Sequence, residues 1–95
     1  MNKNSRKGQS IPLVEIWNTN AYIASDIVPR LKAFKDYSVN YPLDFKNGEE
    51  WDKAIDKMIY AFELISECKP HSDDKQKDIK EGFDLFCKYF FQLWD

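Results

Sequence analysis

The chain has 95 residues, of which 43% are hydrophobic and 32% are charged, and its net charge at pH 7 is −2. These values are typical of one soluble globular domain, because two domains of half this length would each be too small to bury a stable core. The three glycines and four prolines are too few for the many turns of a β-sandwich or barrel. We therefore expect an all-α protein. No apolar run is long enough to span a membrane, so we also expect no membrane partner.

The charge is unevenly distributed along the chain. Residues 1–10 carry three basic side chains and no acid, and we expect them to form a flexible basic tail. Residues 11–95, which we expect to form a single all-α domain, hold 11 basic and 16 acidic side chains. A nucleic-acid-binding protein normally presents a concentrated basic face, so this balance argues against a nucleic-acid partner. The polar start lacks the apolar stretch of a signal peptide, which predicts a cytoplasmic protein.

The first helix is predicted at residues 19–37. The side chains at positions 18–20 can cap free N–H groups at its start, and four large apolar residues then recur at helical spacing. Pro29 lies inside this stripe, where a proline normally costs about 3 kcal/mol. Because the stripe keeps its phase across Pro29, we predict one helix kinked there, with two short helices as the alternative. Residues 11–17 fit either an extended segment or one helical turn. The stripe consists of Ile23, Ile27, Leu31 and Phe34.

The second helix begins after a loop at residues 38–46. Asn47 can cap it, and Glu50 follows three residues later, as in a capping box. Lys69 and Pro70 end the element. Its apolar stripe consists of Trp51, Ile55, Met58, Ile59, Phe62, Ile65 and Cys68.

The third helix is predicted at residues 74–94, with Ser72 or Asp73 as its cap. It forms an antiparallel hairpin with the second helix, which gives a three-helix, bundle-like domain. Gly82 lies beside its apolar stripe. Because a glycine inside a helix costs up to about 1 kcal/mol, its presence predicts that another backbone approaches closely there. The stripe consists of Ile79, Phe83, Phe86, Cys87, Phe90 and Trp94.

The end of the chain carries more apolar surface than one helix face can bury. Leu85, Tyr89 and Phe91 lie off the main stripe of the third helix. A chain end is normally polar and frayed, and aromatic residues make up 16% of this chain. We therefore predict that Leu85, Tyr89, Phe91 and Trp94 form an interface, either in a homo-oligomer or with a target protein.

The cysteines and the single histidine carry no recognisable site. Cys68 and Cys87 have apolar neighbours and belong to no CxxC pair, so we expect two buried free thiols, with a disulfide between the two helices as the alternative. His71 lies in the polar loop, where we expect it to be solvated. One histidine and two separated cysteines do not supply the four or so ligands of a zinc site. We predict no metal and no cofactor.

The start of the first helix is the predicted site for a small anion. A helix N-terminus presents free N–H groups and a partial positive charge. Trp17 and Tyr22 can stack on a base beside Asn18, and Arg30 and Lys35 add positive charge further along. A nucleotide fits this chemistry. The alternative is that the two aromatic rings are simply core anchors.

Acidic residues on the second and third helices raise an enzymatic alternative. Carboxylates from neighbouring helices can hold Mg²⁺ for phosphate-ester hydrolysis, as in all-α nucleotide pyrophosphohydrolases, and Glu81 would be essential to such a site. However, lysines interleave with these acids at spacings of three or four residues, which is typical of a solvated, salt-bridged surface. We therefore predict a non-enzyme, with the hydrolase as the alternative. The acids are Glu49, Glu50, Asp52, Asp56, Glu63, Glu67, Asp78, Glu81 and Asp84, and the lysines are Lys53, Lys57, Lys77, Lys80 and Lys88.

Six segments of the chain resemble a set of small proteins encoded by bacteriophages and prophages. They are 16–18 (IWN), 29–35 (PRLKAFK), 41–42 (YP), 50–52 (EWD), 57–63 (KMIYAFE) and 82–94 (GFDLFCKYFFQLW). The resemblance covers about residues 14–95 and implies a bacterial host cell as the setting. Small acidic proteins without catalytic motifs are often inhibitors in that setting. The resemblance therefore implies a binding protein that blocks a host defence protein or sequesters a nucleotide signal; a structural or assembly accessory of the phage particle is a further alternative.

Overall fold

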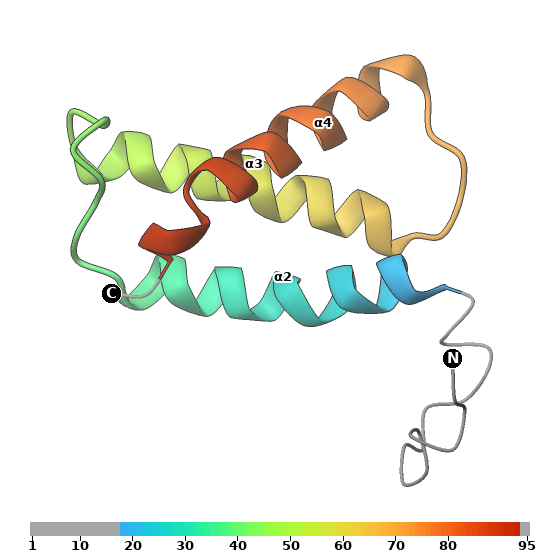
Figure 1. The fold of residues 1–95 in the computed structure, drawn as a ribbon, viewed down its shortest axis with the longest axis horizontal. Helices are drawn as coiled ribbons and strands as arrows, with labels where there is room; N and C mark the ends of the chain where they lie inside the picture. Colours follow the sequence, from blue (N-terminus) through green and yellow to red (C-terminus); the bar gives the residue numbers. More distant parts are fainter. Residues whose placement is uncertain (1–17, 94–95) are drawn as a thin grey trace, which may run out of the picture.

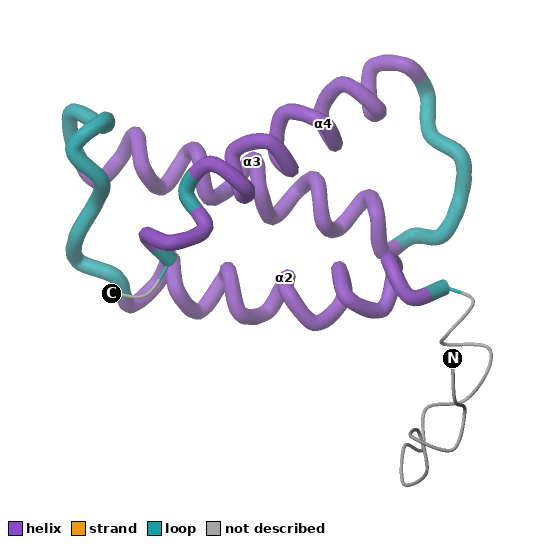
Figure 2. Tube along the Cα trace, in the orientation of Figure 1, coloured by secondary structure: helices purple, strands orange, loops and turns teal. Residues whose placement is uncertain are grey.

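The described part of the molecule is entirely helical apart from its loops. A computed structural model describes residues 18–93. Within this range it contains α2 (Thr19–Tyr37), α3 (Gly48–Ser66), α4 (Asp73–Lys88) and the short 3₁₀ helix η2 (Phe90–Gln92), with no strand (Figures 1 and 2). The predicted all-α fold is confirmed. The predictions for the basic tail, for residues 11–17 and for Trp94 lie outside the described residues.

α2 is a single helix that continues through Pro29, as Figure 1 shows. The alternative of two short helices meeting at Pro29 is therefore wrong. The Asn18 carbonyl oxygen accepts hydrogen bonds from the N–H groups of Ala21 and Tyr22, which closes the first turn. The face that α2 buries is made by Ala21, Ala24 and Leu31.

The predicted capping residues begin the other two long helices. The Asn47 side-chain oxygen accepts a hydrogen bond from the N–H of Glu50 at 2.8 Å, and the Ser72 hydroxyl accepts one from the N–H of Lys75 at 3.4 Å. Each bond satisfies a backbone donor that has no partner within its own helix. α3 ends where Cys68 adopts a left-handed backbone conformation with φ of 57°, which stops the helix just before the predicted Lys69–Pro70 signal.

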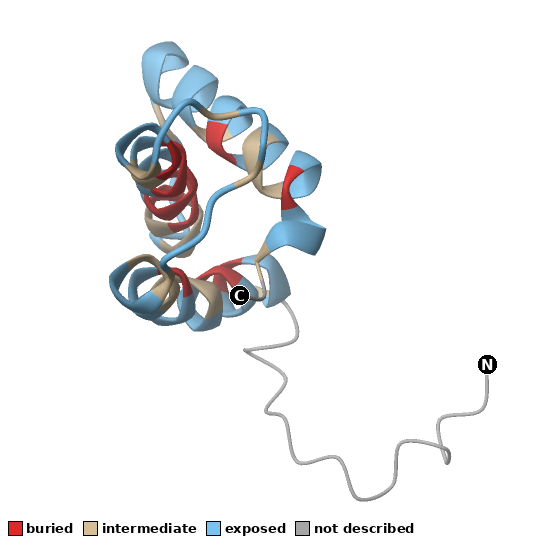
Figure 3. Ribbon diagram, turned by 90° about the vertical axis from the view of Figure 1, so that its left-hand side faces the viewer, coloured by how far each residue is buried: buried red, intermediate tan, exposed pale blue. Residues whose placement is uncertain are grey.

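α3 is the central element of the fold. Both α2 and α4 pack against it, whereas α2 and α4 do not pack against each other within the described residues. Successive helices run in opposite directions, and α4 crosses α3 obliquely (Figure 1). Buried positions are concentrated on α2 and α3, whereas α4 is mostly exposed (Figure 3). Within the described residues, the side of the bundle between α2 and α4 is therefore not closed by contact between these two helices, and we call it the open side.

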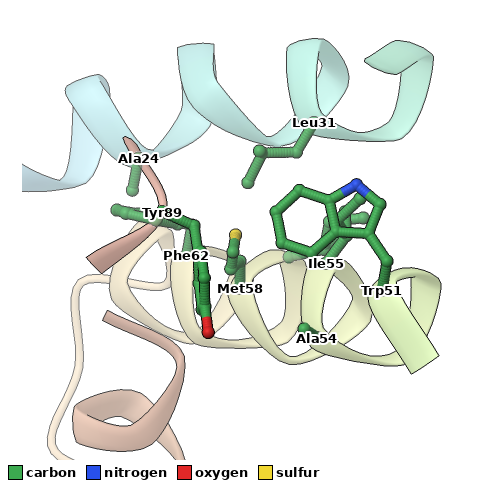
Figure 4. Close-up of a cluster of buried hydrophobic side chains, with 9 residues drawn as sticks. Ala24, Leu31, Trp51, Ala54, Ile55, Met58, Phe62 and Tyr89 are labelled. Atoms are coloured by element: carbon green, nitrogen blue, oxygen red, sulfur yellow. The ribbon is translucent and has the colours of Figure 1, made fainter. Parts of the chain in front are cut away.

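The core lies along the inner face of α3. Figure 4 shows this cluster, whose members come from α2, α3 and the residue after α4. Three aromatic rings close one end of it: Phe45 lies 5.1 Å from Trp51 and 5.1 Å from Tyr89, centroid to centroid. The Tyr89 hydroxyl donates a hydrogen bond to Asp44 at 3.0 Å, which ties the end of α4 to the loop before α3. The core cluster consists of Ala24, Leu31, Trp51, Ala54, Ile55, Met58, Ile59, Phe62 and Tyr89.

The third helix ends earlier than predicted. α4 stops at Lys88, and Tyr89 leaves the helical conformation before η2 begins, so a continuous helix to residue 94 is wrong. The change of direction turns the Tyr89 side chain into the core, where only 6% of its surface is exposed. Phe83 and Phe90, which were predicted to be core residues, are exposed instead. The apolar stripe of the sequence therefore has a different phase from the buried face.

The structure also corrects the predictions for the cysteines and the histidine. Cys68 and Cys87 are free, as predicted, but both are exposed rather than buried. His71 is not solvated, since its side chain is 8% exposed. Its Nε2 lies 2.8 Å from the carbonyl oxygen of Leu64 near the C-terminus of α3, an oxygen that also accepts a hydrogen bond from the N–H of Glu67 at 3.2 Å. His71 thus acts as a cap for α3.

Candidate functional site

The residues predicted to bind a small anion do not converge. Asn18 and Lys35 lie at opposite ends of α2, about 25 Å apart along its axis. Tyr22 and Arg30 are exposed on that helix, and Trp17 lies outside the described residues. Lys35 is already occupied: its Nζ donates to Asp56 at 2.7 Å, and this hydrogen bond raises the pKa of Lys35 above its ordinary value of 10.5. The structure therefore does not assemble these five residues into one site.

The predicted interface residues are divided between the core and the surface. Tyr89 belongs to the core, which corrects its assignment to an interface. Leu85 is partly buried against that core. Phe91 is 80% exposed, and its ring lies 5.5 Å from that of Phe90. Trp94 lies outside the described residues. Only Phe91 therefore keeps the exposure that an interface residue needs, and the homo-oligomer remains a prediction.

A groove with a volume of about 680 Å³ lies between α3 and α4. Both helices contribute residues three or four positions apart, so one face of each helix forms one wall. Ala54, Leu85 and Phe45 form the apolar floor. The groove is lined by Phe45, Glu50, Lys53, Ala54, Lys57, Lys77, Lys80, Glu81, Asp84, Leu85 and Lys88.

Gly82 sets the distance between the two walls of this groove. A Cβ atom at this position would lie 2.3 Å from the backbone oxygen of Lys57 and 2.5 Å from Cβ of Ala61. Glycine is therefore what lets α4 approach α3 so closely, as the sequence predicted. Beside this crossing, Lys57 and Glu81 form an ion pair of 2.7 Å across the two helices. The contact at Gly82 and this ion pair together hold the walls in place.

The border of the groove is positively charged, although the protein as a whole carries a net negative charge. Five lysines and three carboxylates line it. Lys57 and Lys80 are paired with Glu81 and Asp84. Lys77 and Lys88 have no carboxylate partner within the described residues, and Lys88 instead lies 5.2 Å from the centroid of the Tyr89 ring. Two lysine side chains are thus available to an anionic ligand.

The spacing of charged residues on α4 is a sequence signal for this groove, but the predictions from the sequence do not include the groove. The lysines were attributed to ion pairs within a single helix, and two such pairs exist, Lys53–Glu49 and Lys80–Asp84. However, the shortest pair of the groove, Lys57–Glu81, joins two helices. On α4, positions 77, 81, 84 and 88 repeat at spacings of four, three and four, which places them on one face. Gly82 predicts that another backbone approaches α4 closely. Together with Gly82, this polar face indicates that charged residues of α4 lie beside a neighbouring helix, which the structure shows to be α3.

Three other hollows are smaller, with volumes of about 470, 410 and 350 Å³. One, of about 410 Å³, is lined partly by Lys32, Lys35, Asp56 and Glu63, and these four side chains pair with one another as Lys32–Glu63 and Lys35–Asp56. A second, of about 350 Å³, lies between the start of α2 and the end of α3. The groove between α3 and α4 is therefore the candidate functional site.

The acids that suggested a magnesium enzyme are dispersed. Glu81 and Asp84 are engaged by lysines, and Asp56 and Glu63 by α2. Within residues 18–93, no three carboxylate, histidine or cysteine side chains are grouped closely enough to hold a metal ion. In the same range, no helix combines the length and the apolar composition needed to cross a lipid bilayer.

Comparison with known proteins adds no family to this picture. No protein-family model matches the chain, and no match was found among curated proteins or among solved structures. The function must therefore be argued from the geometry of the groove.

Proposed function

We propose that this protein is a non-catalytic binding protein whose groove between α3 and α4 holds an acidic, amphipathic helix of a partner protein. The observation that supports this most directly is the apolar floor bordered by five lysines in a chain of net charge −2. An amphipathic helix lays its apolar face into a groove of this kind. Carboxylates flanking that face would meet Lys77 and Lys88, and this complementarity favours the correct orientation of the partner.

A helix fits this groove better than a nucleotide does. The walls are formed by the interiors of two helices, whose backbone N–H groups are bonded within each helix and cannot receive phosphate as a helix N-terminus does. The ring of Phe45 is already packed between Trp51 and Tyr89, so a nucleobase lacks a free aromatic face on which to stack.

The resemblance to phage-encoded proteins extends the proposal to a biological role. In an infected bacterium, a small protein that binds one partner tightly can inhibit it without any catalytic residue. We therefore propose that the partner is a host defence protein and that the groove blocks it stoichiometrically. This part of the proposal depends on the resemblance and not on the groove itself.

The groove can be tested with a synthetic probe. We would titrate a fluorescein-labelled amphipathic helix of about four turns, with leucines on one face and glutamates on both flanks, and follow its anisotropy. We expect saturable one-to-one binding that weakens as salt is added. Changing both Lys77 and Lys88 to Glu should weaken binding about tenfold or more, because each exposed charge pair contributes up to about 1 kcal/mol and reversal also adds repulsion.

A matched control separates a site from general attraction. The variant Arg30→Glu, Lys69→Glu changes the net charge by the same amount on surfaces outside the groove, and it should bind the probe almost as the original chain does. Equal weakening by both double variants would contradict the proposal. Binding of a cyclic dinucleotide that depends on Lys77 and Lys88, in the absence of binding to the acidic helix, would assign the groove to a nucleotide instead.

A further inference from the structure

The open side of the bundle, between α2 and α4, carries apolar side chains that no other helix within residues 18–93 covers. Phe83 on α4 is 45% exposed, Phe90 in η2 is 51% exposed, and Ile23 on α2 is 52% exposed. Ile27 and Phe86 lie on the same flanks and are partly buried against the core. We call these five residues, together with Ile79, the α2–α4 face.

The ion pairs show that both apolar flanks border the same opening. Lys32 and Lys35 pair with Glu63 and Asp56 of α3, so this flank of α2 meets the outer side of α3, and Ile23 and Ile27 project from the opposite flank.

α4 likewise has one flank that forms an ion pair with α3 and an opposite flank that carries apolar residues. Glu81 pairs with Lys57 of α3, while Phe83 and Phe86 lie on the other flank. Their ring centroids lie 6.0 and 4.8 Å from that of Phe62, which faces the interior from α3.

One end of this face lies beside the start of α2. Asn18 and Ile79 line the same hollow of about 350 Å³, together with Leu64 and Ile65 from the end of α3. The chain that precedes Asn18 therefore enters the structure at the edge of the α2–α4 face. Exposed apolar surface of this extent, on residues that also contact the core, generally marks a place where another segment or molecule binds.

We propose that residues 11–17 of the same chain dock on the α2–α4 face. These residues lie outside the described part of the chain, and their sequence, IPLVEIW, contains one charged residue, Glu15, and six apolar ones. Fully extended, seven residues span at most about 25 Å. Ile23 lies about 8 Å along α2 from Asn18, and Phe83 about 6 Å along α4 from Ile79, so both lie within reach of the segment.

Tethering favours this segment over a second copy of the chain. A segment attached at the edge of its own binding surface has an effective concentration in the millimolar range, whereas a specific interface between two copies must bury on the order of 1,000 Å² or more. Phe91 belongs to η2 and is not part of the α2–α4 face, and its 80% exposure leaves it available to a partner. This inference uses residues different from those of the groove, so either proposal can fail without the other.

A double-mutant cycle in the full chain tests the docking. Trp17→Ala and Phe83→Ala are made singly and together, and the unfolding equilibrium constant is measured by urea titration. We expect each single change to raise that constant about tenfold, as for a large-to-small change at a partly covered site. Two independent tenfold effects would raise the unfolding equilibrium constant about a hundredfold in the double variant. If the two side chains touch, the double variant should raise this constant by only about twentyfold or less.

A matched control and a direct measurement complete the test. Leu43 is fully exposed in the loop before α3, so Leu43→Ala combined with Trp17→Ala should show no coupling. In the unmodified chain, nuclear Overhauser contacts should join the Trp17 ring to the Ile23 methyl groups, and this measurement does not depend on any variant folding. Additive effects of Trp17 and Phe83 without such contacts would overturn the proposal, as would a stability that rises with protein concentration while Trp17→Ala has no effect.

Discussion

Replacing Gly82 by Ala is the sharpest single test of how α4 sits on α3. Alanine has the higher helix propensity, and this alone would stabilise the protein by about 1 kcal/mol. Against this, the new methyl group would lie 2.3 Å from the Lys57 carbonyl oxygen and 2.5 Å from Cβ of Ala61. Neither atom belongs to the far end of a flexible side chain, so neither can rotate away. The two helices themselves must move apart.

The balance of these two effects gives the expected magnitude. Overpacking a well-packed site costs about 1–3 kcal/mol, and a clash with backbone belongs at the upper end of that range. Subtracting about 1 kcal/mol for helix propensity leaves a net loss of about 2 kcal/mol. For a domain of this size, such a loss lowers Tm by roughly 8–16 °C. The free energy of unfolding is measured by urea titration, followed by circular dichroism at the helix band.

Gly48→Ala is the matched control, because a Cβ atom there would meet only the Tyr41 ring at 3.8 Å, an ordinary contact. We expect this variant to be at least as stable as the original chain. Adding Ala61→Gly to the Gly82→Ala variant should restore only part of the loss, since the contact with the Lys57 carbonyl remains. A Gly82→Ala protein as stable as the original would refute the close approach of α4 to α3, and with it the shape of the groove.

Two further predictions concern the surface. Because the hydrogen bond to Asp56 raises the pKa of Lys35 above 10.5, the stabilisation by this pair should be present below that pH and disappear as the pH rises through the raised pKa. The difference in urea midpoint between Lys35→Gln and the original chain should therefore shrink above pH 10.5. Lys77 has no ion pair within residues 18–93, so Lys77→Gln should show little difference at any pH. Phe91 is 80% exposed, so Phe91→Ser should leave the free energy of unfolding almost unchanged; if the predicted homo-oligomer forms through Phe91, light scattering should show weaker association, and a monomeric original chain at high concentration would contradict the oligomer.

The helix starts could be predicted because their signals are local. Asn47 and Ser72 cap α3 and α4 through hydrogen bonds to residues three positions later, and such bonds depend on only a few neighbouring residues. Gly82 was predictable for a related reason, since a glycine inside a helix needs a compensating contact. The continuity of α2 through Pro29 followed from the phase of its apolar stripe.

The end of α4 could not be predicted because its cause is distant in the sequence. Residues 89–91 are all aromatic, so the pattern continues with no capping residue to mark a stop. The helix ends where Tyr89 turns inward and bonds Asp44, 45 positions earlier in the chain. The same limit applies to His71, whose role as a cap of α3 depends on how the loop folds back over Leu64. The groove combines faces of two helices: the α4 face together with Gly82 indicates a polar seam, but its pairing with the α3 face depends on how the two helices cross.

The distribution of anchors along α4 bears on how the groove would accept a partner. The contacts that hold α4 lie in its middle and at its end, at Gly82 and at the buried Tyr89. From Asp73 to Lys80 every residue is exposed except Ile79, which is half-buried. A helical segment with so few buried contacts opens at a lower free energy than the rest of the domain. Since Lys77 lies in this segment, the wall of the groove that carries a free lysine is also the one that can adjust to a ligand at the lowest cost.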